Sequence, residues 1–95
     1  MKELDIQNRN LIYMLNIGDI FETKDYRGNT IKGEIVTIDN YYKRSIYDLH
    51  TGIITWKVLP EYREITFPDI IFSTYIGLIF EKPDKYKIFK KESNV

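Results

Sequence analysis

His50 is the only histidine of the chain, and Asp48 precedes it by two residues. Residues two apart on an extended strand face the same side, so the imidazole and the carboxylate can touch. Such a pair is the minimum for general-base catalysis, which also needs a nucleophile in a defined position. None of the serines or threonines stands in a recognisable nucleophile motif. A histidine in a turn beside Gly52 is ordinarily a solvated side chain, and we predict a protein without catalytic residues that is not an enzyme.

Cofactor chemistry has no better support in the sequence. The acidic residues are scattered without the spacing of metal ligands, and neither a phosphate-binding loop nor a dinucleotide-type glycine pattern occurs. Cysteine is missing, which excludes disulfides, thiolate metal sites and a cysteine nucleophile, and is consistent with a reducing compartment. We therefore expect no metal and no cofactor.

Aromatic residues stand next to basic ones at several places, as in proteins that stack bases on rings and neutralise phosphates with cations. These places are Tyr41-Tyr42-Lys43-Arg44, Trp56-Lys57, Tyr62-Arg63 and Lys85-Tyr86-Lys87. Strand alternation in a chain rich in tyrosine and lysine produces the same neighbours without any function. The chain has 14 basic and 14 acidic residues, so the overall basic footprint of a nucleic-acid-binding protein is missing.

A local basic excess remains between Lys82 and Lys91, where five lysines accompany Asp84 alone. It indicates either contact with phosphates or lysines that keep an edge strand from pairing with other chains. Binding of single-stranded nucleic acid is therefore kept as the alternative function.

Protein binding has positive support in the composition. Eight tyrosines and one tryptophan exceed what the core of a small domain can hide, and Tyr, Trp and Arg dominate the energetics of interfaces. We predict an interaction surface at Tyr41, Tyr42, Lys43 and Arg44; the alternative is a loop whose rings cap one end of the fold. The preferred partner is another protein or a second copy of this chain.

The elements that must position these residues are predominantly strands. Gly18 to Lys24 and Thr30 to Ile38 are rich in β-branched residues and flank a turn at Gly28-Asn29. Gly33 lies inside the second run, where glycine permits a bend, and the alternation slips at Ile35-Val36, which predicts a bulge.

Further strands are predicted downstream. Arg44 to Leu49 resumes the alternation, and Ile54, Trp56 and Val58 fall on one face of the next strand. Pro60 ends that strand and precedes a loop or a single helical turn. Ile70 to Glu81, a proline turn at Lys82 to Lys85, and Tyr86 to Lys90 are interpreted as a closing β-hairpin. The first seventeen residues fit either a hairpin, with a turn at Asn8 to Asn10, or a short helix.

Both ends of the chain resemble those of YopX-like phage and prophage proteins. The N-terminal match consists of Asn8, Ile12, Tyr13, Gly18, Asp19 and Ile20. The C-terminal match is an Ile-Gly strand followed by a Glu-x-Pro turn, at Ile76, Gly77, Glu81 and Pro83. The resemblance covers nearly the whole chain, but only its ends are specific. It implies an accessory protein with an SH3-like β architecture, compatible with an oligomer, and it brings no established activity and no catalytic residues.

Together these patterns predict one domain over residues 1–95. We expect a mainly β, small SH3-like barrel with an N-terminal hairpin or short helix and a C-terminal β-hairpin. The longest apolar stretch, Ile70 to Phe80, is too short to span a bilayer, and no segment has the pattern of a signal peptide. The expected location is the cytoplasm of a bacterial host cell, with host takeover or counter-defence as the biological setting.

Overall fold

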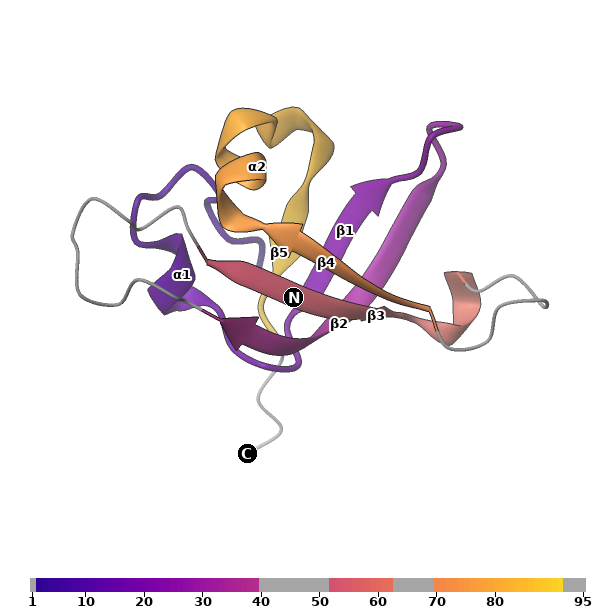
Figure 1. Ribbon diagram of the computed structural model, residues 1–95, viewed down its shortest axis with the longest axis horizontal. Helices are drawn as coiled ribbons and strands as arrows, with labels where there is room; N and C mark the ends of the chain where they lie inside the picture. Colours follow the sequence, from indigo (N-terminus) through magenta and orange to yellow (C-terminus); the bar gives the residue numbers. More distant parts are fainter. Residues whose placement is uncertain (1, 40–51, 63–69, 92–95) are drawn as a thin grey trace.

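A five-stranded antiparallel sheet makes up most of the computed structural model, which describes residues 2–39, 52–62 and 70–91. The strand order is β4-β3-β2-β1-β5 (Figure 1). The strands are β1 (Ile20–Lys24), β2 (Thr30–Asp39), β3 (Ile53–Val58), β4 (Ile71–Tyr75) and β5 (Lys87–Phe89). The predicted mainly β class is confirmed. The strand predicted over Arg44 to Leu49 lies outside the described residues.

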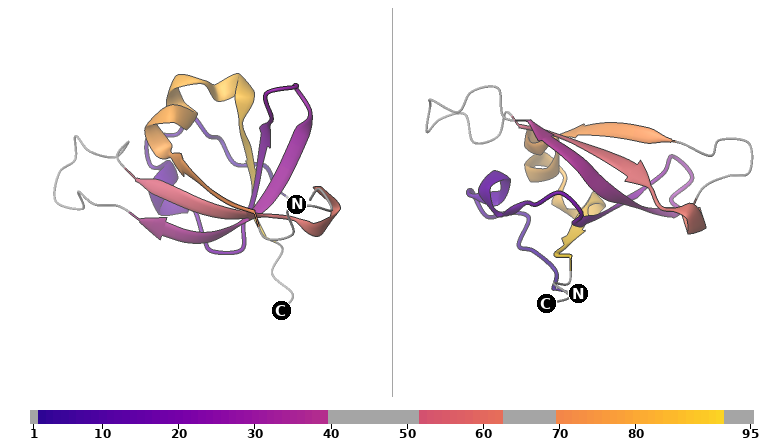
Figure 2. Two further views of the ribbon diagram at one scale, coloured as in Figure 1. Left: turned by 45° about the vertical axis from the view of Figure 1, so that its right-hand side comes forward. Right: turned by 90° about the horizontal axis from the view of Figure 1, so that it is seen from below.

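Two short α-helices, α1 (Leu11–Met14) and α2 (Ile76–Glu81), lie on the same side of the sheet (Figure 2). Two 3₁₀ turns, η2 (Pro60–Tyr62) and η3 (Pro83–Lys85), follow β3 and α2. The N-terminal segment was predicted to form either a hairpin or a short helix, and the structure has the short helix α1. None of the helices in the described part has the length or the apolar run that crossing a bilayer requires.

Across the described ranges the sheet stays open, because its outermost strands, β4 and β5, do not pair with each other. The predicted closing hairpin is wrong: β4 ends at Tyr75, α2 follows at once, and β5 pairs with β1 instead of β4. The reason is helical periodicity. Ile76 and Ile79 are both fully buried, and residues three apart share a face of a helix but point to opposite faces of a strand. Gly77 consequently belongs to α2, not to a strand.

The β1–β2 hairpin matches its prediction. The Asp25 carboxylate accepts hydrogen bonds from the N–H groups of Arg27 at 2.8 Å and Asn29 at 2.9 Å. Gly28 has a φ of +82°, a conformation that favours glycine. The predicted bulge is confirmed by a register shift between Ile35 and Thr37 in the pairing of β2 with β3.

Gly33 makes room for the centre of the core. A Cβ atom at this position would lie 2.3 Å from Cε3 of Trp56 and 2.8 Å from the carbonyl oxygen of Lys57. The indole therefore reaches across β2 and meets Phe21, with ring centroids 5.0 Å apart. Tyr86 lies beyond Phe21 at 5.6 Å, and Phe72 lies on the other side of Trp56 at 5.1 Å. A continuous aromatic row thus runs through the fold and ends at β4.

Asp19 joins the two ends of the chain. Its buried carboxylate accepts hydrogen bonds from the Asn16 N–H at 2.8 Å, the Lys91 N–H at 3.0 Å and the Lys90 ammonium group at 3.0 Å. Lys90 also donates to the carbonyl oxygen of Met14 at 3.0 Å. Because all these donors converge on one carboxylate, the segment before β1 and the segment after β5 hold each other in place.

The close approach at Gly33 predicts a loss of stability in Gly33→Ala. The added methyl group must displace the indole and the facing backbone, and overpacking of this kind costs about 1–3 kcal/mol of the free energy of unfolding. Glu34→Ala, at the next and exposed position of β2, should change it by less than about 0.5 kcal/mol. Urea unfolding followed by Trp56 fluorescence measures both. Equal stability of the two variants would contradict the packing described for Gly33.

Removal of the Asp19 carboxylate is expected to destabilise the fold strongly. Asp19→Ala leaves a partly buried ammonium group and two backbone N–H groups without their acceptor, which costs about 3 kcal/mol or more. Lys90→Met should cost less, because the remaining carboxylate keeps its two backbone donors. Asp39→Ala, at an exposed carboxylate, is the control. Thermal unfolding by circular dichroism ranks the three variants, and a harmless Asp19→Ala would show that the network is dispensable.

Candidate functional site

The residues that sequence analysis singled out first are not placed by the structure. Tyr41, Tyr42, Lys43 and Arg44 lie outside the described residues, as do Asp48 and His50. The predicted interaction surface and the predicted absence of catalysis therefore stay predictions.

Two of the aromatic–basic neighbours place their rings in the core. Trp56 is 4% exposed and Tyr86 6% exposed, so neither ring offers a stacking surface. Burial also raises the pKa of the Tyr86 phenol. In the lysine-rich segment after Lys82, Lys90 is paired with Asp19. These neighbours follow from strand alternation and from the terminal network, and they lend no support to nucleic-acid binding.

A groove opens at the end of the sheet where the β1–β2 turn faces β3, η2 and β4. Its volume is about 570 Å³. The floor is apolar and consists of Ile31, Trp56, Val58, Ile70 and Phe72. The rim comes from the β1–β2 turn, from the strand ends beside it and from η2, with Lys24, Asp25, Tyr26, Arg27, Asn29, Thr30 and Tyr62. Residues from four strands and two connections thus contribute to one hollow surface.

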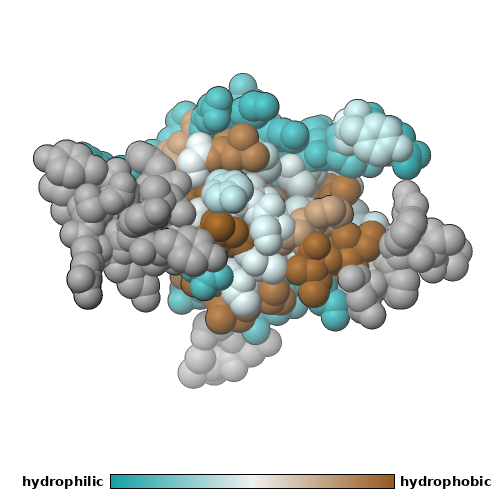
Figure 3. All heavy atoms as spheres, viewed as in Figure 1, coloured by the Kyte–Doolittle hydropathy of each residue, from teal (hydrophilic) through white to brown (hydrophobic). Residues whose placement is uncertain are grey.

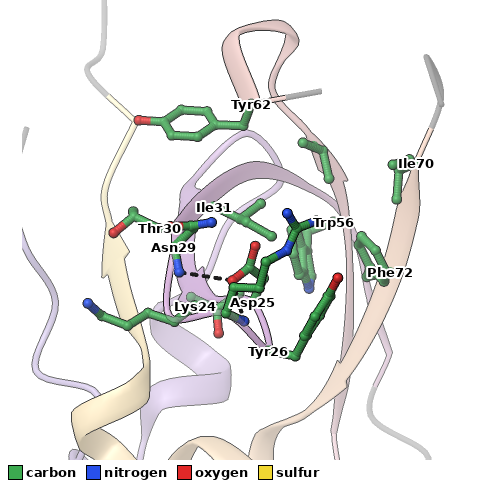
Figure 4. A pocket seen from close by; sticks show the side chains of 13 residues that line it. Lys24, Asp25, Tyr26, Asn29, Thr30, Ile31, Trp56, Tyr62, Ile70 and Phe72 are labelled. Atoms are coloured by element: carbon green, nitrogen blue, oxygen red, sulfur yellow. Dashed lines mark hydrogen bonds between the residues drawn. The ribbon is translucent and has the colours of Figure 1, made fainter. Parts of the chain in front are cut away.

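The aromatic rings of this groove that are most open to solvent are those of Tyr26 and Phe72. Tyr26 is 90% exposed and Phe72 is 45% exposed. Figure 4 shows the Tyr26 ring directed from the turn toward Trp56 and Phe72, while Lys24 points away from them. The Arg27 guanidinium carbon lies 5.0 Å from the centre of the Tyr26 ring, within range of a cation–π interaction. The backbone of the turn that carries Tyr26 is held by the Asp25 carboxylate, which accepts the Arg27 and Asn29 N–H groups.

Further apolar surface continues from the groove along β4. Ile71 is 57% exposed and Tyr75 is 61% exposed, and Figure 3 shows hydrophobic side chains at the surface near the start of β4. Phe72 and Thr74 lie on the inner face of the sheet, where the buried Thr74 hydroxyl accepts a hydrogen bond from the Trp56 indole at 3.0 Å. The edge strand therefore exposes apolar side chains on the outer face and also at the groove.

The groove has the chemistry of a recognition surface. Its floor is apolar, its rim carries aromatic rings, and it combines the cations Lys24 and Arg27 with a carboxylate, Asp25, that is engaged in the turn. Within residues 2–39, 52–62 and 70–91, no three or more His, Cys, Asp or Glu side chains converge as metal ligands would. A second, smaller hollow lies between the N-terminal segment and η3, with Glu3, Asp5 and Asp84 among its lining residues.

Comparison of the chain with protein-family models, with curated proteins and with solved structures finds no match. The site is therefore interpreted from its own geometry.

Sequence reasoning missed Tyr26 and Phe72. Tyr26 stands in the predicted turn, directly before Arg27 and Gly28. A large aromatic residue in a tight turn has no core to enter, and this was a usable signal. Phe72 carried no such signal, because its alternation with Thr74 is the same as that of a buried residue. Its exposure depends on the open edge of the sheet, which only the tertiary structure reveals.

Proposed function

We propose that this chain is a non-catalytic protein-interaction module, which binds a host or phage protein or a second copy of itself. The observation that carries the proposal is the pair of open rings in the apolar groove, Tyr26 at 90% and Phe72 at 45% exposure. Burial of one such ring in an interface contributes roughly 1.5–3 kcal/mol. Aromatic residues that fill pockets are the usual centres of binding energy in protein interfaces.

The groove also has a rigid support, which favours binding without a large entropic cost. Phe72 stacks on Trp56, and Trp56 is bonded to Thr74 and wedged over Gly33. Tyr26 is held by the hydrogen-bonded turn around Asp25. A partner side chain that enters the groove beside Phe72 meets a ring that is already packed on the core.

We propose in addition that the sheet is an SH3-like small barrel with an open side. Strands β1 to β4 follow one another as a meander, and β5 returns to lie beside β1 after helical turns. This strand order supports the SH3-like interpretation. Small barrels of related kinds bind their ligands on an open face and through the adjoining loops, which agrees with the position of the groove.

The biological setting proposed here is that of a phage or prophage accessory protein in a bacterial cytoplasm, with host takeover or counter-defence as its role. It rests on the resemblance to YopX-like proteins. Several of the residues that carry the resemblance have structural roles in this chain: the Asn8 side chain accepts the Asn10 N–H at 2.8 Å, Gly18 has a φ of +99°, and Asp19 is the buried hub. These roles are consistent with a shared structure and bring no shared chemistry.

Binding of single-stranded nucleic acid is the second candidate. One observation favours it: Tyr26, Tyr62 and Phe72 are all exposed around a groove that also holds Lys24 and Arg27. Rings and cations in this combination bind unpaired bases and their phosphates. The zero net charge of the chain argues against it.

Protein binding through the groove is tested with Tyr26→Ala and Phe72→Ala, with Tyr13→Ala as the matched control. Tyr13 is also a well-exposed tyrosine, at 66%, but does not line the groove. We expect the wild type and Tyr13→Ala to retain the same proteins from a phage-infected lysate. Both groove variants should retain these proteins in amounts at least about tenfold lower. Quantitative mass spectrometry of the retained proteins measures this, and Tyr41→Ala and Tyr42→Ala test the loop predicted from the sequence in the same assay. Equal retention by all variants would show that the groove does not bind these proteins.

Nucleic-acid binding is tested by fluorescence anisotropy with labelled oligo-dT at low salt. The proposal predicts no binding. A complex that weakens steeply with added salt and fails in Arg27→Glu, but not in the control Arg9→Glu at an exposed site away from the groove, would establish the second candidate instead.

A further inference from the structure

Strand β4 has a free edge among the described residues. In its ladder with β3, the Ile76 N–H donates to the carbonyl oxygen of Gly52 at 2.8 Å, and the Val58 N–H donates to that of Ile70 at 3.0 Å. Hydrogen-bonded pairs recur at every second residue of an antiparallel ladder.

The groups that point away from β3 follow from this register. Phe72 and Thr74 lie opposite Trp56 and Ile54 and direct their backbone groups to β3. The N–H and C=O groups of the alternate residues, Ile71, Ser73 and Tyr75, therefore point outward. They form a row that another strand can join.

The opposite edge of the sheet is covered by the chain itself. The Leu4 N–H donates to the carbonyl oxygen of Ile88 at 2.8 Å, and the Lys90 N–H donates to that of Lys2 at 2.7 Å. Glu3 and Phe89 form an isolated antiparallel β-bridge through their backbones. The N-terminal segment thus occupies the edge of β5, and the only strand with a long free edge in the described part of the chain is β4.

Strand β4 also lacks the features that keep edge strands from pairing. Its sequence, Ile-Phe-Ser-Thr-Tyr, has no charged residue and no proline, and no bulge interrupts its register with β3. Natural edge strands usually carry such protection. An apolar edge with regular, outward-pointing backbone groups is the pattern of a strand that has a partner.

We propose that this partner is a second copy of the chain, whose β4 pairs antiparallel with the first across a two-fold axis at Ser73. This inference rests on the proposed function and names its partner. In this register Ile71 of each copy lies opposite Tyr75 of the other, on the outer face, and an aromatic residue opposite a β-branched one is a favourable cross-strand pair. Phe72 lies opposite Thr74 on the inner face. Three hydrogen-bonded pairs give about six intermolecular hydrogen bonds.

Charge and topology both favour a second copy as the occupant. Two copies of a chain with zero net charge do not repel each other at long range, and two charge-free β4 strands bring no like charges together. The contact is isologous, because the same strand serves on both sides. Since the edge of β5 is already covered, the assembly closes at two copies and does not continue as a filament.

Sedimentation velocity of the full chain over a wide concentration range tests the proposal. We expect a monomer of 11.4 kDa at low concentration and a species of twice that mass at high concentration. Ser73→Pro removes the outward N–H at the centre of the contact and breaks no backbone hydrogen bond to β3, so we expect it to raise the dimer dissociation constant about tenfold or more. Ser73→Ala loses the same hydroxyl contact with Thr55, 3.3 Å away, but keeps the N–H, and should dimerise like the wild type.

Ile71→Glu is the second variant, because Ile71 is exposed and its substitution leaves the core intact. It places a carboxylate opposite Tyr75 of the other copy and should also favour the monomer. A wild type that stays monomeric at all concentrations, or a dimer that survives both Ser73→Pro and Ile71→Glu, would overturn the proposal. If a monomeric wild type still retained other proteins through Tyr26 and Phe72, the proposed function would stand without the dimer. Failure of both assays would exclude the dimer and the proposed function alike.

Discussion

The absence of a side chain at Gly33 determines how the inner face of the sheet is packed. Because no Cβ atom occupies this position, the Trp56 ring lies over β2 and contacts Phe21 on the far side. Tyr86 and Phe72 extend the contact in both directions, so one aromatic row connects the approach to β5 with the edge strand β4. The last ring of this row is half open to solvent at the groove. The packing of the core therefore leads directly to the surface to which we assign binding.

Local patterns predicted the elements whose partners are close in sequence. The hairpin of β1 and β2, the bulge after Ile35 and the alternation of Ile54, Trp56 and Val58 were all visible, because turn chemistry and a period of two are local properties. The segment after Tyr75 was misassigned. Its run of β-branched and aromatic residues is typical of a strand, but burial of Ile76 and Ile79 on one face favours a helix that covers the sheet. Tertiary packing overrides local propensity in such short elements.

The candidate site was harder to predict than the fold, for a physical reason. Exposure of Phe72 results from the open edge of β4, and an open edge depends on which strands pair, not on the residues of one strand. The lysine-rich segment after Lys82 also could not be interpreted from local sequence, because the partner of a lysine depends on the tertiary structure. Lys90 looked like part of a basic surface, but its ammonium group is bound to Asp19, more than seventy residues earlier in the chain. Tyr26 alone could have been found from the sequence, as an aromatic residue in a tight turn.

Residue-resolved amide hydrogen exchange shows directly whether β4 offers a free edge to a second copy. In dilute solution we expect fast exchange at Ile71, Ser73 and Tyr75 and slow exchange at Phe72 and Thr74, whose N–H groups face β3. At high concentration, exchange at the first three amides should slow while the other two stay slow. Uniform protection along β4 in dilute solution, or alternation that does not respond to concentration, would contradict pairing of this edge with a second copy.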